Sequence, residues 1–109
     1  MSTSSSDTAT VIFDRAGRHL TAYIAGELDV ATWPAIDDAL AAHIRPDDER
    51  VWLDLSTTTS CDTGCVPRLL RLHQQVEEAG GRLVLYQPIV QVADAIRSCD
   101  QDRRLLIRT

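Results

Sequence analysis

Residues 53–66 read LDLSTTTSCDTGCV, and this stretch decides how the rest of the chain folds. Apolar residues at positions 51–55 predict a buried strand. A loop rich in hydroxyl groups is expected at positions 56–60. It leads through residues 61–64 into a helix-period segment at 67–78. Such a strand-to-helix turn lies at the carboxyl end of a strand, where α/β proteins usually carry their functional residues.

The segments around this stretch alternate between strand and helix patterns. Residues 9–14 and 19–25 predict two strands, and the short link between them predicts an antiparallel hairpin. The other predicted elements are helices at about 33–44, 67–78 and 88–99 and strands at 50–55, 82–86 and 105–107. The order β-β-α-β-α-β-α-β predicts an α/β fold, with a mixed, mostly parallel sheet and helices packed on the sheet.

Composition and charge limit the possible classes of function. We expect residues 1–8, which are rich in Ser and Thr, to be a disordered tail, and residues 9–109 to form a single domain. The net charge of −5 argues against nucleic acid or an anionic membrane as a partner. No apolar segment approaches the roughly 20 residues that span a bilayer, and no signal peptide is recognisable. The protein is therefore expected to be cytoplasmic, as a monomer or an oligomer.

Several short motifs, taken in order, resemble the STAS domain, specifically the bacterial anti-sigma-factor antagonists. The likeness covers about residues 9–107. The matching motifs are Gly26-Glu27-Leu28-Asp29, Leu53-Asp54-Leu55-Ser56, Cys61-Asp62, Leu69-Leu70-Arg71-Leu72-His73 and the run from Ala79 to Leu85.

The resemblance implies a partner-switching mechanism. Members of this family bind an anti-sigma factor that carries a GHKL-type serine kinase domain. Phosphorylation of the Ser or Thr directly after the motif aspartate releases them, and a PP2C-type phosphatase resets the switch. In this chain the implied phosphoacceptor is Thr63. The implied partner-binding residues are Glu27, Asp29, Asp62, Gly64 and Cys65.

The turn after Asp62 departs from the family pattern. Glycine comes one place early, at Gly64, and Cys65 stands where glycine is expected. Pro67 cannot donate the N–H bond that a helix starting at Thr63 would need, so a helix start at Pro67 and a looser acceptor turn are expected. These departures motivate an alternative function, a STAS-type protein-binding scaffold that is not phosphorylated.

Each site residue also has a structural interpretation. Thr63 is equally well read as an unmodified hydroxyl at the helix entry, and Asp62 as an ordinary helix cap. Glu27 and Asp29 could serve only in the turn and cap before the first helix. The alternatives stay open at the level of the sequence.

The three cysteines suggest a further alternative, a redox sensor built from Cys61, Cys65 and Cys99. Cytoplasmic thiols usually remain reduced, and a disulfide has demanding geometry, so this is the less favoured hypothesis. We expect no metal site, because a CxxxC spacing with His73 is not a usual zinc pattern. No nucleophile pairs with a base at a recognised spacing, and there is no phosphate-binding glycine loop. We therefore expect no enzymatic activity and no cofactor.

Overall fold

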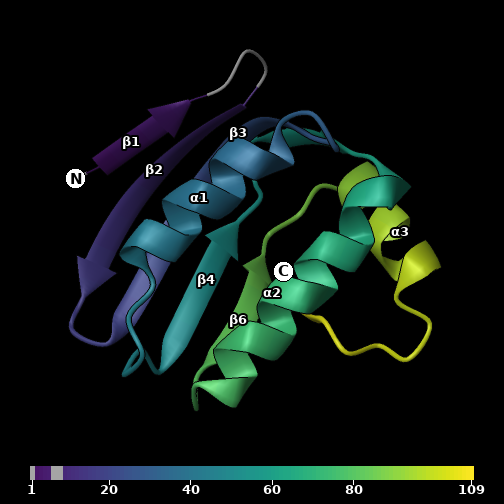
Figure 1. The fold of residues 1–109 in the computed structure, drawn as a ribbon. Coiled ribbons are helices and arrows are strands. Elements are labelled where there is room, and N and C mark those ends of the chain that lie inside the picture. The colour runs from purple at the N-terminus through teal and green to yellow at the C-terminus, as the bar shows by residue number, and fades with distance from the viewer. Residues whose placement is uncertain (1, 6–8) are drawn as a thin grey trace.

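In the computed structural model, the described part of the chain, residues 2–5 and 9–109, forms a seven-stranded sheet with three α-helices (Figure 1). The strand order is β1-β2-β3-β4-β6-β7, and β5 pairs with β3 beyond the end of β4. The strands are β1 (Ser2–Ser5), β2 (Ala9–Ala16), β3 (His19–Leu28), β4 (Arg50–Asp54), β5 (Thr58–Cys61), β6 (Arg82–Tyr86) and β7 (Leu106–Arg108). The helices are α1 (Trp33–His43), α2 (Val66–Glu78), α3 (Val90–Cys99) and the short 3-10 helix η1 (Thr63–Cys65).

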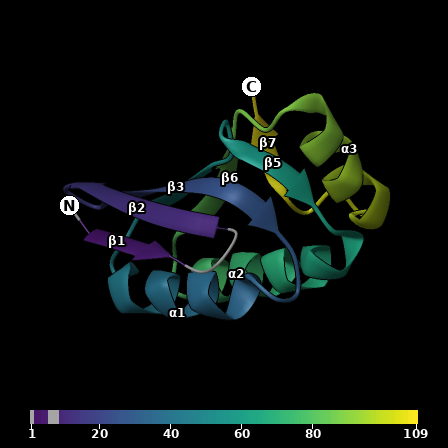
Figure 2. The same ribbon diagram turned by 90° about the horizontal axis from the view of Figure 1, so that it is seen from above.

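The helices lie on different sides of the molecule. Seen from above, α1 and α2 lie together on one face of the sheet, whereas α3 lies away from them and next to β5 (Figure 2). The opposite face of β2, β3 and β4 carries no helix (Figure 2). Over the described residues, no helix combines the length and the apolar character needed to cross a membrane.

The predicted α/β fold with a mixed, mostly parallel sheet is confirmed. β2 and β3 form the expected antiparallel hairpin, whose turn contains Gly17 in the left-handed region at φ 61°. The pairs β3–β4, β3–β5, β4–β6 and β6–β7 are all parallel. The predicted end of the second helix at position 78 is confirmed. It is followed by Gly80, which has φ 91° and whose N–H donates to the Glu77 carbonyl at 2.9 Å.

Two strands were not expected from the sequence. Within the predicted disordered tail, Ser2–Ser5 form β1 and pair with β2, so that expectation is wrong for these residues, and residues 1 and 6–8 lie outside the described part. Without β1, one edge of β2 would present unpaired backbone groups, and an extended segment nearby can satisfy them. The expectation of a hydroxyl-rich loop at 56–60 is wrong for residues 58–60, because Thr58–Cys61 form β5.

The core lies between the sheet and the pair α1 and α2. Three alternating residues of β4 and the turn after it, Val51, Leu53 and Leu55, are completely buried on this side. The buried residues that α1 and α2 contribute follow helical spacing. They are Trp33, Ile36, Ala39 and Leu40 from α1, and Val66, Leu69, Leu72, His73 and Val76 from α2. Each of the two helices therefore turns an apolar face toward the sheet.

An ion pair ties the β2–β3 hairpin to the loop after α1. The Arg15 guanidinium contacts both carboxylate oxygens of Asp48, and its Nη2 also donates to the His43 carbonyl at 2.8 Å. The hydrogen bond from Arg15 holds the pKa of the Asp48 carboxyl below its ordinary value, against the opposing effect of burial. The Asp48 side chain is only 2% exposed, so loss of its partner would leave a buried charge.

We predict that Asp48→Ala lowers the free energy of unfolding by about 3 kcal/mol at pH 7, because Arg15 would lose its partner. The contribution of Asp48 is fully present above the ordinary aspartate pKa of about 3.9 and is lost as the pH falls through its lower folded value. Urea unfolding measured from pH 7 downward checks both statements. Asp47→Ala is the matched control, since the Asp47 side chain is 68% exposed, and a change below about 0.5 kcal/mol is expected. Equal losses for the two variants would contradict the assignment.

Candidate functional site

The turn between β4 and β5 is built from threonine hydroxyls that bind the backbone of β3. β4 pairs with β3 only as far as Tyr23, and β5 resumes the pairing at Gly26. In the gap between the two strands, Thr58 Oγ1 donates to the Ile24 carbonyl at 2.7 Å, and Thr57 Oγ1 reaches the same oxygen at 3.2 Å. The hydroxyls therefore replace the sheet hydrogen bonds that the gap removes, which is why this segment contains so many of them.

Gly26 lets β3 bend toward β5. Its φ of 102° is the left-handed conformation that favours glycine, and the register between β3 and β5 shifts between Gly26 and Glu27. After this bulge Glu27 pairs with Ser60, and the Asp62 N–H donates to the Leu28 carbonyl at 2.8 Å. The end of β3, with Glu27, therefore lies beside the end of β5 and beside Asp62, which directly follows β5.

Asp62 caps the turn that carries Thr63. Its Oδ1 accepts the Gly64 N–H at 3.1 Å, and the Cys65 N–H donates to the Asp62 carbonyl at 2.9 Å. The Val66 N–H then donates to the Thr63 carbonyl, three residues back. This 3-10 bond replaces the α-helical bond that Pro67 cannot make. α2 begins at Val66, one residue before the expected start at Pro67. The expectation of a looser acceptor turn is wrong, because a 3-10 turn starting at Thr63 leads directly into α2.

Asp29 fixes the turn before α1. Its Oδ1 accepts the N–H groups of Ala31 at 2.9 Å and Thr32 at 2.8 Å. The Thr32 hydroxyl donates to the Glu27 carbonyl at 2.8 Å, so the turn is also tied to the end of β3. Asp29 and Asp62 thus both act as caps, as the structural interpretation of the sequence predicted. Both also lie near the turn that carries Thr63.

The structure brings most of the predicted site residues into one surface, which we call the acidic turn surface. It consists of Glu27, Asp29, Val30, Asp62, Thr63 and Gly64. Gly64 lies against Val30, since a methyl group added to Gly64 would contact Val30 Cγ2 at 3.4 Å. Val30 is 47% exposed and was not predicted as a site residue, because a single valine between an aspartate and an alanine carries no functional signal in the sequence.

Thr63 is exposed at the centre of this arrangement. Among the hydrogen bonds within the described part of the chain, none engages its hydroxyl.

Cys65, which the family resemblance placed in contact with the partner, is completely buried beneath the turn. Its side chain packs in the core and presents no surface for a protein to bind.

Cys61 and Cys65 do not have the properties of reactive thiols. Burial raises the pKa of Cys61 to about 11, and the Asp62 carboxylate adds to this effect. Burial also raises the pKa of Cys65 to about 12, with further contributions from neighbouring groups such as Cys61. Both thiols are therefore protonated at neutral pH, whereas oxidation and disulfide exchange need the thiolate. Cys61, Cys65 and Cys99 are all free, and Cys99 is exposed.

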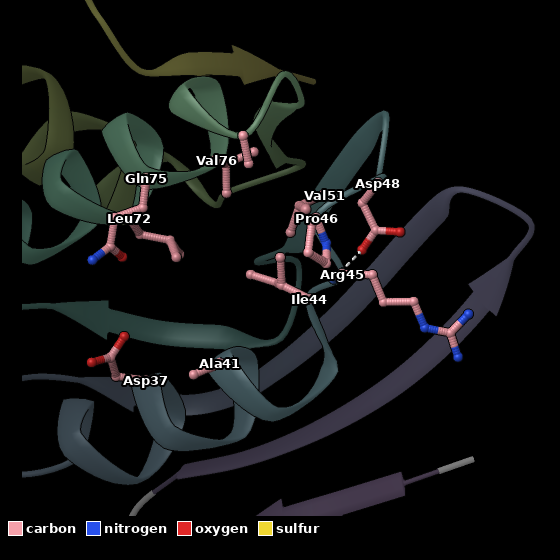
Figure 3. Close-up of a pocket in the computed structure, with 11 residues that line it drawn as sticks. Asp37, Ala41, Ile44, Arg45, Pro46, Asp48, Val51, Leu72, Gln75 and Val76 are labelled. Atoms are coloured by element: carbon pink, nitrogen blue, oxygen red, sulfur yellow. Dashed lines mark hydrogen bonds between the residues drawn. The ribbon is translucent and has the colours of Figure 1, made fainter.

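Two further features lie apart from the acidic turn surface. A hollow of about 250 Å³ opens between α1, the loop after it and α2 (Figure 3), and no predicted site residue lines it. Its lining residues are Asp37, Ala41, Ile44, Arg45, Pro46, Asp48, Val51, Leu72, Gln75, Val76 and Ala79. Over residues 2–5 and 9–109, no group of three or more His, Cys, Asp or Glu side chains is placed to hold a metal ion.

Comparison with known proteins identifies the family. The family model described as "Mlab, STAS domain" matches residues 11–108, which is nearly the whole chain. The chain therefore belongs to the STAS domain family. A sequence comparison with curated proteins finds no match.

Solved structures with the same fold include anti-sigma factor antagonists. One from Mycobacterium paratuberculosis has a TM-score of 0.80 and 17% identity, over 96% of this chain and 89% of that one. An antisigma-factor antagonist STAS domain from Rhodobacter sphaeroides has a TM-score of 0.63 and 18% identity, over 84% and 99% of the two chains. RsbS from Moorella thermoacetica, in a variant form, has a TM-score of 0.68 and 17% identity, over 91% and 85%.

We predict that Thr58→Val destabilises the protein by about 1–2 kcal/mol, because the buried Ile24 carbonyl would keep only the longer bond from Thr57. Valine preserves the shape and the β-branching of threonine, so the loss reports the hydroxyl alone. Chemical unfolding measures the change. Thr59→Val is the control, because Thr59 is exposed and its bond to the Gly26 carbonyl is longer, at 3.2 Å. If both variants unfold like the wild type, the hydroxyl bridge does not stabilise the turn.

We also predict an order of thiol labelling. At pH 7.5 iodoacetamide should alkylate Cys99 first, Cys61 much more slowly and Cys65 only after unfolding, since Cys61 and Cys65 are protonated and Cys65 is buried. The rate at Cys61 should rise steadily as the pH approaches 11. Peptide mass spectrometry over time gives the three rates. Labelling of Cys65 as fast as Cys99 at pH 7.5 would favour the redox-sensor hypothesis instead.

Proposed function

We propose that this chain is a cytoplasmic anti-sigma factor antagonist that acts by binding and not by catalysis. Its partner would be an anti-sigma factor with a GHKL-type serine kinase domain, and the acidic turn surface would be the docking site. Phosphorylation of Thr63 would release the partner, and a PP2C-type phosphatase would restore binding. The proposal joins the family membership to the position of one side chain.

The exposed Thr63 hydroxyl at the entrance of α2 is the observation that carries this proposal. A kinase needs an accessible hydroxyl on a segment that can enter its active site, and Thr63 is the exposed first residue of η1. The three threonines before it are less suitable. Thr58 is buried in its bond to Ile24, and Thr57 and Thr59 also donate to backbone carbonyls of β3.

The local charges explain how a phosphate would change binding. The phosphate brings nearly two negative charges to a surface that already contains the carboxylates of Glu27, Asp29 and Asp62. A partner that binds these carboxylates would face them with cations and would keep its own acidic groups away from them. The added negative charge and volume of a phosphate would disturb this complementary arrangement. The fold itself should tolerate the phosphate, because the amino end of a helix favours an anion.

A STAS-type scaffold that binds constitutively is the second candidate. It is favoured by the sequence Thr63-Gly64-Cys65, which the structure folds into a 3-10 turn that is hydrogen-bonded through Asp62. A turn fixed in this way could bind a partner without being a good kinase substrate. The two candidates share the acidic turn surface and differ only in the role of the Thr63 hydroxyl.

We predict that candidate anti-sigma factor kinases that bind this protein transfer phosphate from ATP to Thr63, as mapped by mass spectrometry. Thr63→Glu should weaken binding to the same kinase by at least about tenfold, because like charges across an interface are unfavourable. Binding is measured by isothermal titration calorimetry, with thermal unfolding to confirm that the variant is folded.

Two controls separate the candidates. Thr59→Glu places the same charge on an exposed residue of β5 and should leave binding within about twofold of the wild type, as surface changes usually have small effects. Thr63→Ala should bind like the wild type and accept no phosphate. If a tightly binding kinase leaves Thr63 unmodified and Thr63→Glu still binds normally, the constitutive scaffold is the correct function.

A further inference from the structure

A second candidate site lies on the face of the sheet opposite α1 and α2. Because Val51, Leu53 and Leu55 point into the core, the alternating residues Trp52 and Asp54 of β4 point to the opposite face. There they line a pocket of about 290 Å³ together with residues from the two neighbouring strands. The full lining is Thr21, Tyr23, Trp52, Asp54 and Tyr86.

The strand register places a carboxylate between two aromatic rings. Asp54 lies opposite Tyr23 of β3 on one side and opposite Tyr86 of β6 on the other. Neighbouring strands are about 4.8 Å apart, so the three side chains form a short row across the sheet. Trp52 precedes them on the same face, and its ring meets the Tyr86 ring edge to face, with centroids 5.8 Å apart. Three of the five aromatic residues of the chain thus surround one acid.

The Asp54 side chain has one engaged and one unengaged oxygen. Oδ1 accepts the N–H of Ser56 at 3.0 Å and its hydroxyl at 2.6 Å. Oδ2 has no hydrogen-bond partner among the described residues, although Asp54 is only 9% exposed. The pocket is therefore lined by a carboxylate whose second oxygen is free to bind a ligand. A cation bound in the pocket would gain a charge-assisted contact with this carboxylate.

Among residues 2–5 and 9–109, no cation forms an ion pair with Asp54. Arg108 of β7 lies opposite Tyr86, one strand further from Asp54, and forms no ion pair with Asp54 within the described residues. On the other flank, Asp14 of β2 lies opposite Thr21 and adds a second negative charge to this face. The pocket therefore combines a carboxylate with aromatic side chains and is open to solvent.

We propose that this pocket binds an alkylammonium group. Aromatic rings attract cations through their negative faces, and they favour methylated ammonium groups, which are weakly hydrated. A guanidinium group fits less well, because it prefers to bind both oxygens of a carboxylate and Oδ1 is already occupied by Ser56. The ammonium group could belong to a free quaternary amine or to a lysine side chain. Neither depends on the phosphorylation of Thr63.

The test is a titration followed by the indole N–H signals in two-dimensional ¹H–¹⁵N NMR spectra. Trp52 lies in the pocket, whereas Trp33 is 4% exposed in the core and serves as an internal reference. Choline represents a free quaternary amine, and Nα-acetyl-lysine amide represents a lysine side chain. We expect saturable shifts of the Trp52 signal with at least one of them and no shift of the Trp33 signal. The tighter of the two identifies the source of the ammonium group.

The variants assign the binding to Asp54. Asp54→Asn keeps an oxygen for both Ser56 bonds and removes the charge, so it should fold normally and weaken binding about tenfold or more. Tyr23→Leu should weaken it several-fold through loss of one ring. Asp14→Asn removes an acid from the same face outside the pocket and should leave the affinity within about twofold.

Three results would overturn the proposal. The first is the absence of a saturable Trp52 shift with either ammonium compound. The second is equal binding of 3,3-dimethylbutan-1-ol, the neutral carbon counterpart of choline. The third is an unchanged affinity of Asp54→Asn. Any of them would show that the pocket is an apolar depression or a packing detail of the sheet.

Discussion

The hydrogen bond from the buried Thr58 hydroxyl to the Ile24 carbonyl is the interaction on which the functional end of this molecule depends. β3 is longer than β4, so the edge of β3 needs a second partner where β4 stops. The hydroxyls of residues 57 and 58 fill the gap and allow the chain to turn and continue as β5. The position of Asp62 and Thr63 follows from this, because both directly follow β5.

The capping residues of the site have more than one role. Asp29 and Asp62 each use one carboxylate oxygen to hold a turn, and the same turns place their charges beside Thr63. Of the two roles that the sequence left open, cap or interface, the hydrogen bonds show the cap. The proposed interface would be built from these capped residues, so a partner would meet a surface whose backbone is already fixed.

Most of the fold could be predicted from the sequence, because its core elements have strong local patterns. The alternation around Val51 and Leu53 and the helical spacing from Leu69 to Val76 predict elements that the structure contains. β5 could not be predicted this way, since a run of hydroxyl residues is typical of loops and its strand conformation depends on the distant edge of β3. The 3-10 turn before Pro67 was missed for a similar reason. Sequence rules predict where a proline is tolerated, but not how the preceding turn adapts its hydrogen bonds.

Asp54 orders a turn and also lines a pocket. Its Oδ1 binds the N–H and hydroxyl of Ser56, and its side chain lines the aromatic pocket of the open face. When related chains are aligned, an acid retained at this position is therefore ambiguous, because the turn alone is enough to keep it. The informative positions are 23, 52 and 86. A related chain that uses the acid only to order the turn at Ser56 has no reason to keep aromatic residues at these positions. Co-variation of these three positions would distinguish a family-wide structural residue from a specialised recognition feature of one branch.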